Sequence, residues 1–374
     1  MSKRRILIAP LDWGLGHATR CVPLIQQLQE EGHELILTAN GRAEYFLKQS
    51  FPELQFVSSP EYSIRYSRYF PMWLMMLIQS PSLLYNFYKE NKWLDKFIAE
   101  NKIDQIISDN RYGLWSKKIK SIFITHQVMI KCPSSLRFME SPLHRIVKWF
   151  MNKYSECWIP DVAGENNLSG DLSHRYSLPE NAKYIGWLSR FTKPANPEEI
   201  LQQTEKAKYS ICFLLSGPEP QRTELENKIL SIENFLPKNC ILIQGKTEII
   251  AEEKSGNNLF ITSHLAQEEL RKIILDADLI VCRSGYSSIM DLEILGKDAL
   301  LIPTPGQSEQ EYLADYSQEK GRFSKMSQEE FSRSFVSFLK HREISLQQKT
   351  IPQDKSLAGS KNNLRSSDRV ALVE

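Results

Sequence analysis

The sequence has no long hydrophobic run. None of its stretches approaches the roughly 18 consecutive apolar residues that would cross a bilayer as a helix. The N-terminus has a basic start but only a short apolar run, which is typical of a first β-strand and not of a signal peptide. We therefore expect a cytoplasmic protein without a membrane-spanning segment.

An excess of charge of one sign is also missing. The 374 residues carry a formal net charge of +2, and this balance gives no electrostatic case for a nucleic-acid partner. The six cysteines are scattered without a Cys-x-x-Cys pair, which indicates reduced, buried thiols and argues against disulfides or a zinc site. The histidines and cysteines show no metal-ligand spacing, so we expect neither a metal nor another cofactor.

Short apolar runs alternate with helical segments through both halves of the chain. This rhythm is typical of α/β domains with a parallel sheet, and the length suffices for two domains of about 100–200 residues each. We expect a doubly wound domain over 1–190 and a second over 209–346, facing each other across a cleft. The segment 191–208, which contains two prolines, is the expected linker, and the polar segment 347–374 is expected to be a disordered tail.

The most informative stretch is 281–314, which has the pattern strand, tight turn, helix, strand and polar loop. Ligands of an open parallel sheet bind beyond the carboxyl ends of the strands, where helix N-termini point. Asp291 is expected in the first turn of the helix 289–295, where its carboxylate could accept two hydrogen bonds from a vicinal diol such as a ribose. Gln310 and Glu311 begin the following helix and could line the same pocket.

The turn Gly14-Leu15-Gly16-His17 follows the first expected strand and opens a helix, so a dinucleotide site has to be considered. Thr19 stands where that motif needs its third glycine, and the second strand ends without an acidic residue for a ribose. His17 is instead a candidate general base, because an imidazole with a pKa near neutrality could deprotonate an acceptor hydroxyl. It could also bind a phosphate, or be a solvated residue at the start of the helix.

Two polar clusters follow later strands of the same half. Asp109, Asn110 and Arg111 form the first and His126 begins the second, each just beyond the carboxyl end of an apolar strand and therefore expected at the cleft. Asp109 is the rival candidate for the base, and His126 could position the acceptor. Turn chemistry also explains these clusters, since Asp and Asn often bond the local backbone. Arg20 is either a phosphate partner or a surface charge.

The stretch 281–314 resembles the donor site of GT-B glycosyltransferases, most closely that of the MurG-like N-acetylglucosaminyltransferases. In that family a Cys-Arg-Ser-Gly turn precedes an acidic residue on the nucleotide ribose and a Gln pair on the donor sugar. The turn here is 282–285, the acid is Asp291 instead of Glu, and the second Gln is replaced by Glu311. Ser287 and Ser288 are expected to cap the helix. The resemblance implies a donor site formed by Ser216, Gly217, Arg222, Leu265, Arg283, Ser284, Gly285, Ser287, Asp291, Gln310 and Glu311.

The same resemblance implies two Rossmann-like domains that carry the acceptor and the donor, respectively. It implies metal-independent, inverting transfer of a hexose or N-acetylhexosamine from a nucleotide-sugar, with UDP as the expected nucleotide, to a glycan or lipid-linked acceptor. The acceptor side would include Gly14, Gly16, Asn110, Arg111 and His126. Two alternatives stay open. One is a nucleotide-sugar hydrolase or epimerase, whose Gly-Leu-Gly-His-x-x-Arg loop is similar, and the other is a non-catalytic partner that binds a sugar-nucleotide.

The segment 62–98 is rich in aromatic and basic residues and contains an apolar run at 72–78. Such a segment could lie on a bilayer surface, and MurG-like enzymes use a comparable patch to reach lipid-linked acceptors. Core packing of two helices explains the same residues, and the stretch 144–150 has the same two interpretations. A membrane contact would place the protein on the inner face of the cell membrane.

Overall fold

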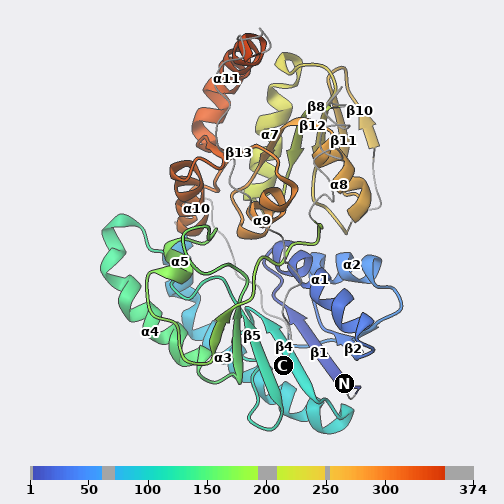
Figure 1. Ribbon diagram of the computed structural model, residues 1–374, viewed down its shortest axis with the longest axis vertical. Coiled ribbons are helices and arrows are strands. Elements are labelled where there is room, and N and C mark those ends of the chain that lie inside the picture. The colour runs from blue at the N-terminus through green and yellow to red at the C-terminus, as the bar shows by residue number, and fades with distance from the viewer. Residues whose placement is uncertain (1–2, 61–71, 193–208, 249–252, 350–374) are drawn as a thin grey trace, which may run out of the picture.

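The structure is a computed structural model that describes residues 3–60, 72–192, 209–248 and 253–349. The first half of the chain forms a seven-stranded sheet with the order β3-β2-β1-β4-β5-β6-β7 (Figure 1). All of its strand pairs are parallel. Its strands are β1 (Arg5–Pro10), β2 (Glu34–Leu37), β3 (Gln55–Phe56), β4 (Gln105–Asp109), β5 (Lys120–Ile124), β6 (Glu156–Ile159) and β7 (Ala182–Tyr184).

The second half forms another seven-stranded sheet, with the order β10-β11-β9-β8-β12-β13-β14. The edge strand β10 is antiparallel to β11, and the other pairs are parallel. The strands are β8 (Tyr209–Leu214), β9 (Cys240–Ile243), β10 (Glu253–Ser255), β11 (Leu259–Thr262), β12 (Ala277–Cys282), β13 (Ala299–Leu301) and β14 (Ser324–Lys325). The prediction of two doubly wound α/β domains is confirmed.

Helices cover both faces of each sheet. The central strands are apolar runs because both of their faces are buried, and Leu7, Ile8, Ile280 and Val281 are almost fully inaccessible. The helices of the first half are α1 (Gly16–Glu30), α2 (Gly41–Ser50), α3 (Met72–Asn101), α4 (Glu140–Met151) and α5 (Asp171–His174), with a 3-10 helix at Ser134–Met139. Those of the second are α7 (Gln221–Ser231), α8 (Gln267–Leu275), α9 (Tyr286–Leu295), α10 (Ser308–Glu319) and α11 (Gln328–Lys349), with a 3-10 helix at Glu233–Phe235.

One helix start differs from its prediction. Helix α9 has Gly285 at its N-cap, so Ser287 and Ser288 lie inside the first turn and do not cap it. Asp291 consequently lies in the second turn. The sequence placed the cap too late because serine favours caps, whereas here the extended backbone of Gly285 ends the turn. Gly296 ends the helix in the left-handed conformation, as expected from its sequence position.

The domain boundaries remain a prediction. Residues 193–208 of the expected linker and 350–374 of the expected tail lie outside the described residues. Helix α11 extends to Lys349, into the segment that was expected to be disordered.

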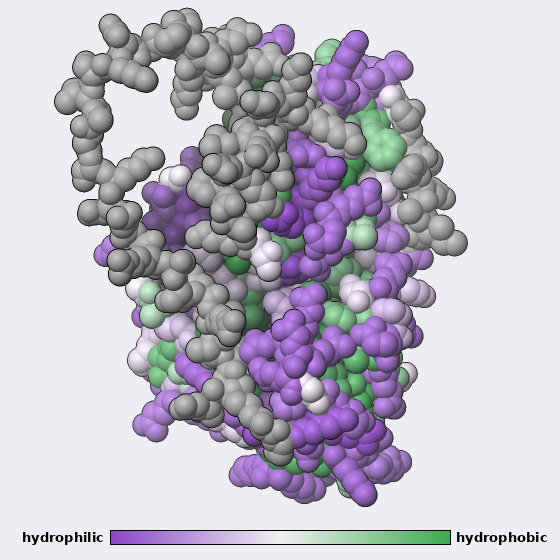
Figure 2. Space-filling view, turned by 45° about the vertical axis from the view of Figure 1, so that its right-hand side comes forward, coloured by the Kyte–Doolittle hydropathy of each residue, from purple (hydrophilic) through white to green (hydrophobic). Residues whose placement is uncertain are grey.

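The two halves are in direct contact through their loops and helix ends. Helix α1 packs against α9. The hydroxyl of Tyr286 donates to the carbonyl of Pro160 at 2.8 Å, and that of Ser287 donates to the carbonyl of Gly16 at 2.8 Å. Helix α10 reaches down to α5, where the backbone N–H of Asp171 donates to Tyr312 (Figure 1). The face in Figure 2 is covered mainly by hydrophilic side chains and is hollowed between the two halves.

Candidate active site between the two domains

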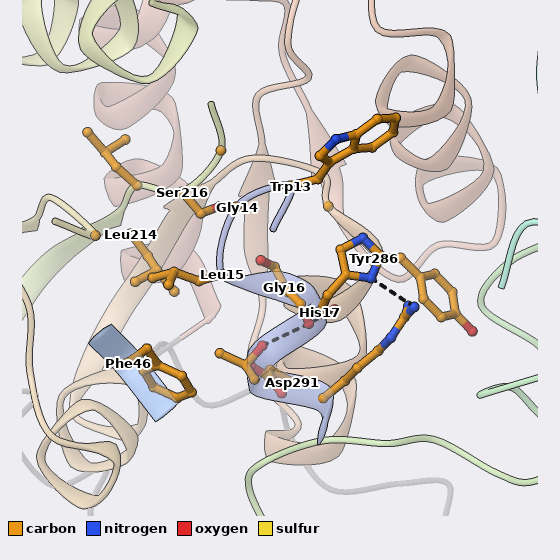
Figure 3. A pocket seen from close by; sticks show the side chains of 18 of the residues that line it. Trp13, Gly14, Leu15, Gly16, His17, Phe46, Leu214, Ser216, Tyr286 and Asp291 are labelled. Atoms are coloured by element: carbon orange, nitrogen blue, oxygen red, sulfur yellow. Dashed lines mark hydrogen bonds between the residues drawn. The ribbon is translucent and has the colours of Figure 1, made fainter. Parts of the chain in front are cut away.

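A pocket lies between the carboxyl ends of the two sheets. The first half contributes the turn after β1, the start of α1 and the ends of β4 and β5. The second half contributes the loops after β8, β9, β11 and β12 and the start of α10. Of the residues singled out from the sequence, the lining includes Gly14, Gly16, His17, Asn110, His126, Ser216, Gly217, Leu265, Gly285, Ser287, Asp291 and Gln310 (Figure 3).

The glycine turn approaches the second half very closely. A Cβ on Gly14 would lie 3.5 Å from the Cα of Gly217, and one on Gly16 would lie 3.1 Å from the Oγ of Ser287. Gly14 also has a φ of +82°, which side-chain-bearing residues rarely adopt. A side chain at Gly16 would therefore have to displace Ser287, whereas at Gly14 it is the positive φ, and not a lack of space, that favours glycine.

His17 points into this pocket from the start of α1 (Figure 3). Its Nδ1 lies 2.7 Å from Oδ1 of Asp109, at the end of β4. Arg20, one helical turn after His17, binds both carboxylate oxygens of Asp109. Asp109 is fully buried and does not line the pocket. Asp109, the rival candidate for the base, is therefore not among the groups that face the pocket, and it contacts Nδ1 of His17 instead.

The charge state of Asp109 follows from its partners. Burial by itself would raise the pKa of this carboxyl, but the guanidinium of Arg20 and the imidazole of His17 outweigh burial and lower the pKa to about 2. The same pairing raises the pKa of Arg20 despite its burial. Asp109 and Arg20 thus form a buried ion pair beneath the glycine turn, and Arg20 is neither a surface charge nor free to hold a phosphate.

His126 connects this ion pair to the second half. Its Nδ1 lies 2.9 Å from Nη1 of Arg20, and its Nε2 lies 2.8 Å from Oε1 of Glu309 in α10. Gln127 donates to the other oxygen of Glu309. The ring of Tyr286 stacks on His126, with centroids 4.3 Å apart and planes within 2°. Burial lowers the pKa of His126, which favours the neutral imidazole.

Glu309 was not anticipated from the sequence. It lines the pocket together with Gln310, whereas Glu311 faces away and accepts a hydrogen bond from the backbone N–H of Gly306. Glu311 therefore does not contribute to the pocket, because α10 begins at Ser308 and turns position 311 outward. The exact start of α10 decides which of its side chains face the cleft, and the sequence did not show where this helix begins.

Asp291 lines the pocket but is already engaged. Its Oδ1 accepts a hydrogen bond from Ser189 at 2.5 Å, and its Oδ2 lies 3.2 Å from Nε of Arg190. Burial raises the pKa of this carboxyl, although Arg190 and Ser189 oppose the shift. A carboxylate has about four lone-pair positions, so these two partners leave capacity for a diol.

Two arginines of the second half, Arg222 and Arg283, do not line the pocket. Arg222 is buried and bound to Glu219 and Glu226. Arg283 is 1% exposed and donates to the carbonyls of Gln221, Ile302 and Pro303 and to Gln328. Both were expected to hold the donor, and both instead stabilise the loops around it because acceptors of those loops surround their guanidinium groups.

Two other residues that were predicted for the site, Arg111 and Ser284, stabilise the surrounding structure. Arg111 forms a buried ion pair with Glu90 and bonds to Ser59, away from the pocket lining. Ser284 is buried and donates to the carbonyl of Gln310 at 2.7 Å, which ties the turn after β12 to α10.

Comparisons with known proteins agree with this architecture. Residues 224–361 match the glycosyltransferase family 28 C-terminal domain. A UDP-N-acetylglucosamine–N-acetylmuramyl-(pentapeptide) pyrophosphoryl-undecaprenol N-acetylglucosamine transferase from Buchnera aphidicola subsp. Acyrthosiphon pisum (strain 5A) is 31% identical over 267 residues, which cover 60% of this chain and 73% of the relative. The enzyme of the same name from Clostridium tetani (strain Massachusetts / E88) is 26% identical over 345 residues, 84% of this chain and 83% of the relative.

Solved structures share the fold at low sequence identity. Acinetobacter baumannii MurG superposes with a TM-score of 0.52 at 13% identity, covering 90% of this chain and 91% of that one. The glycotransferase of kitacinnamycin gives a TM-score of 0.59 at 13% identity, covering 91% of each chain. Two facing Rossmann-like domains, the interdomain pocket and the sequence relatives agree: the chain belongs to the MurG-like glycosyltransferases of family 28.

Proposed function

We propose that this glycosyltransferase moves a hexose or N-acetylhexosamine from a UDP-linked donor to a hydroxyl of a lipid-linked or envelope glycan acceptor. The reaction inverts the anomeric carbon and needs no metal. The donor lies against the second half and the acceptor against the first. The names of the curated relatives, which contain both UDP-N-acetylglucosamine and a pyrophosphoryl-undecaprenol acceptor, support this choice of substrates.

The observation that carries the proposal is the placement of His17. Its Nδ1 is held by a buried carboxylate, and the ring lines the pocket between the two domains. A proton on Nδ1 leaves Nε2 as the basic nitrogen, which can take the proton of an acceptor hydroxyl as that oxygen attacks the sugar. The acceptor oxygen attacks the anomeric carbon on the face opposite the nucleotide, and the nucleotide diphosphate leaves. The configuration of the anomeric carbon is therefore inverted.

The second half offers a helix N-terminus and polar side chains to the donor. The N-terminus of the ten-residue helix α9 opens on the pocket at Gly285, where the backbone dipoles favour the negative diphosphate of the leaving nucleotide. This stabilisation takes the place of a metal ion in the proposal. Asp291 would accept from the ribose diol, the backbone near Leu265 would contact the base, and Glu309 with Gln310 would bind sugar hydroxyls.

A membrane contact is supported by an apolar patch on α3 and α4. The patch consists of side chains at least half exposed, namely Leu77, Ile78, Leu84, Tyr85, Tyr88, Ile146 and Trp149. Lys89, Lys92 and Lys153 lie over aromatic rings of this patch. Helices carrying apolar and basic side chains of this kind bind the interface of anionic bilayers. We propose that the patch rests on the inner face of the cell membrane.

The last turns of α3 are buried, in contrast to the exposed patch. Leu94, Phe97 and Ile98 are buried in the core. Core packing therefore explains the end of this helix, and the proposed membrane contact concerns only its exposed part; residues 61–71 lie outside the described residues. No helix in the described ranges is long and apolar enough to span a bilayer.

The donor assignment is tested by thermal shift and by turnover. UDP at 100 times its dissociation constant should stabilise the protein by about 2.7 kcal/mol, which raises Tm by roughly 5 °C or more. GDP, ADP, CMP and NAD should not, and Asp291→Ala should weaken the UDP shift. Stabilisation by another nucleotide alone would contradict the UDP assignment. NMR with the donor alone separates transferase from hydrolase, because rapid release of free sugar without acceptor would support the hydrolase.

The membrane contact is tested by sedimentation with vesicles of phosphatidylglycerol and phosphatidylcholine. Trp149→Glu combined with Ile146→Glu should leave the protein in the supernatant. Phe235→Glu is the matched control, because Phe235 is 67% exposed on the second half. Equal vesicle binding by wild type and the double variant would contradict the proposed surface.

A further inference from the structure

The ion pair of Arg20 and Asp109 touches two histidines of the cleft. Asp109 lies 2.7 Å from Nδ1 of His17, and Arg20 lies 2.9 Å from Nδ1 of His126. Each contact is made by Nδ1 of its histidine, but the partner of His17 is an anion and the partner of His126 is a cation. The two partners therefore favour opposite positions for the proton of a neutral imidazole.

The proton of neutral His17 belongs on Nδ1. The carboxylate of Asp109 is ionised and can only accept hydrogen bonds. A deprotonated Nδ1 would place two lone pairs 2.7 Å apart in a buried site. Nη2 of Arg20 also lies 3.0 Å from this nitrogen, but the hydrogen that Nη2 directs to this side is donated to Oδ1 of Asp109, which is the stronger acceptor.

The proton of neutral His126 belongs on Nε2. A guanidinium has five donors and no acceptor, so its 2.9 Å contact requires a lone pair on Nδ1. The other nitrogen then carries the hydrogen and faces Oε1 of Glu309 at 2.8 Å, where an acceptor is in place. Stacking on Tyr286 holds the plane of the ring.

We propose that one buried ion pair holds the two cleft histidines in opposite tautomers, which makes His17 a proton acceptor and His126 a hydrogen-bond donor. Arg20 and Asp109 are positioning residues in this scheme. His126 directs its N–H across the cleft and, with Gln127, orients Glu309 toward the sugar. The role of His17 as base rests on the proposed function, but the tautomers themselves do not.

The direct test is 15N NMR of the ring nitrogens on protein labelled at histidine. The spectra are recorded at about pH 8, above the usual histidine pKa of about 6.5. The structure provides an internal reference for each tautomer. Nδ1 of His144 faces the carbonyl of Val128 and must carry a proton, whereas Nδ1 of His33 accepts from the backbone N–H of Arg4.

We expect the His17 signals to follow those of His144 and the His126 signals to follow those of His33. Single His→Gln variants assign the signals. The same tautomer for His17 and His126 in the wild type would overturn the proposal, whatever the enzyme does with its substrates. Opposite tautomers in a protein without transferase activity would instead sustain the proposal and reject the function.

Substitutions by glutamine test the consequence for turnover. Gln can donate an N–H but cannot act as a base, so His126→Gln should restore most of what His126→Leu loses. His17→Gln should lose about 10²- to 10⁴-fold in kcat, like His17→Ala. Equal losses in His17→Gln and His126→Gln would contradict the division of roles.

Arg20→Lys and Asp109→Asn test the positioning residues. A lysine cannot bind both oxygens of Asp109 and also reach His126, so Arg20→Lys should mix the His126 tautomers and raise KM for the donor by about tenfold. Asp109→Asn should lower kcat by about 10³- to 10⁴-fold at little change in KM, because the amide can also stabilise the other His17 tautomer. Unchanged ring signals in both variants would overturn the proposal.

Discussion

The two sides of the cleft are built from different chemistry. The first half presents His17 and His126, whose orientation depends on a fully buried ion pair. The second half presents glycine turns and a helix N-terminus, while Arg222 and Arg283 are turned into its framework. The comparison teaches that proton transfer and diphosphate binding place different demands on a fold. A base needs a fixed tautomer, whereas a diphosphate can be held by backbone dipoles.

The largest effect that this comparison predicts is on turnover. His17→Ala should lower kcat by about 10²- to 10⁴-fold because the acceptor hydroxyl loses its base. The dissociation constant for UDP, measured by calorimetry, should stay close to that of wild type. His33→Ala is the control, since His33 lies outside the pocket lining. A variant that loses UDP affinity but keeps kcat would assign His17 to the donor instead.

Removing an arginine from the second half should affect stability and leave donor affinity unchanged. Arg283→Leu leaves several buried carbonyls without a donor and should lower the free energy of unfolding by about 3 kcal/mol. Urea unfolding measures this loss, and calorimetry with UDP measures affinity on the folded variant. A large rise in the UDP dissociation constant of folded Arg283→Leu would show that the second half does use this cation.

The ion pair of Arg20 and Asp109 in the first half should make the free energy of unfolding depend on pH. The pKa of Asp109 is about 2 in the folded protein and 3.8 for the ordinary carboxyl, so the unfolded chain binds the proton more readily. The resulting stabilisation, about 2 kcal/mol, is complete above pH 4 and is lost as the pH falls toward 2.

Asp109→Asn should lack this contribution to the pH profile. Chemical denaturation of both proteins between pH 6 and pH 2 measures it. Identical slopes for wild type and Asp109→Asn would mean that the carboxyl is not paired as described.

The smallest effect is expected at the outer rim, where the two halves meet through exposed charges. Arg42 of α2 binds Glu219 and Glu248 of the second half. Arg42→Met should change stability by less than about 1 kcal/mol, because exposed ion pairs are screened. A thermal melt at low and high salt measures this difference. A larger, salt-independent loss would indicate that the rim contributes as much as the buried contacts.

The alternation of strands and helices, and the places where the loops of the cleft would lie, could be predicted from the chain alone. Apolar runs can be recognised without knowing which segments they contact. In a parallel sheet, the residues that follow the strands all lie at the same edge. For this reason Gly14, Gly16, His17 and the turn before α9 could be expected at the edge of the sheets from the sequence, and they line the pocket.

The tertiary structure alone decided which charges meet. Arg20 and Asp109 are far apart in the chain, and nothing local pairs them. Likewise, Arg222 and Arg283 follow strands as a phosphate ligand would, but neighbouring acceptors turn them inward. Glu309 faces the cleft and Glu311 does not because of where α10 begins. Electrostatic partners depend on distances between distant segments, and those distances exist only once both sheets have folded and met.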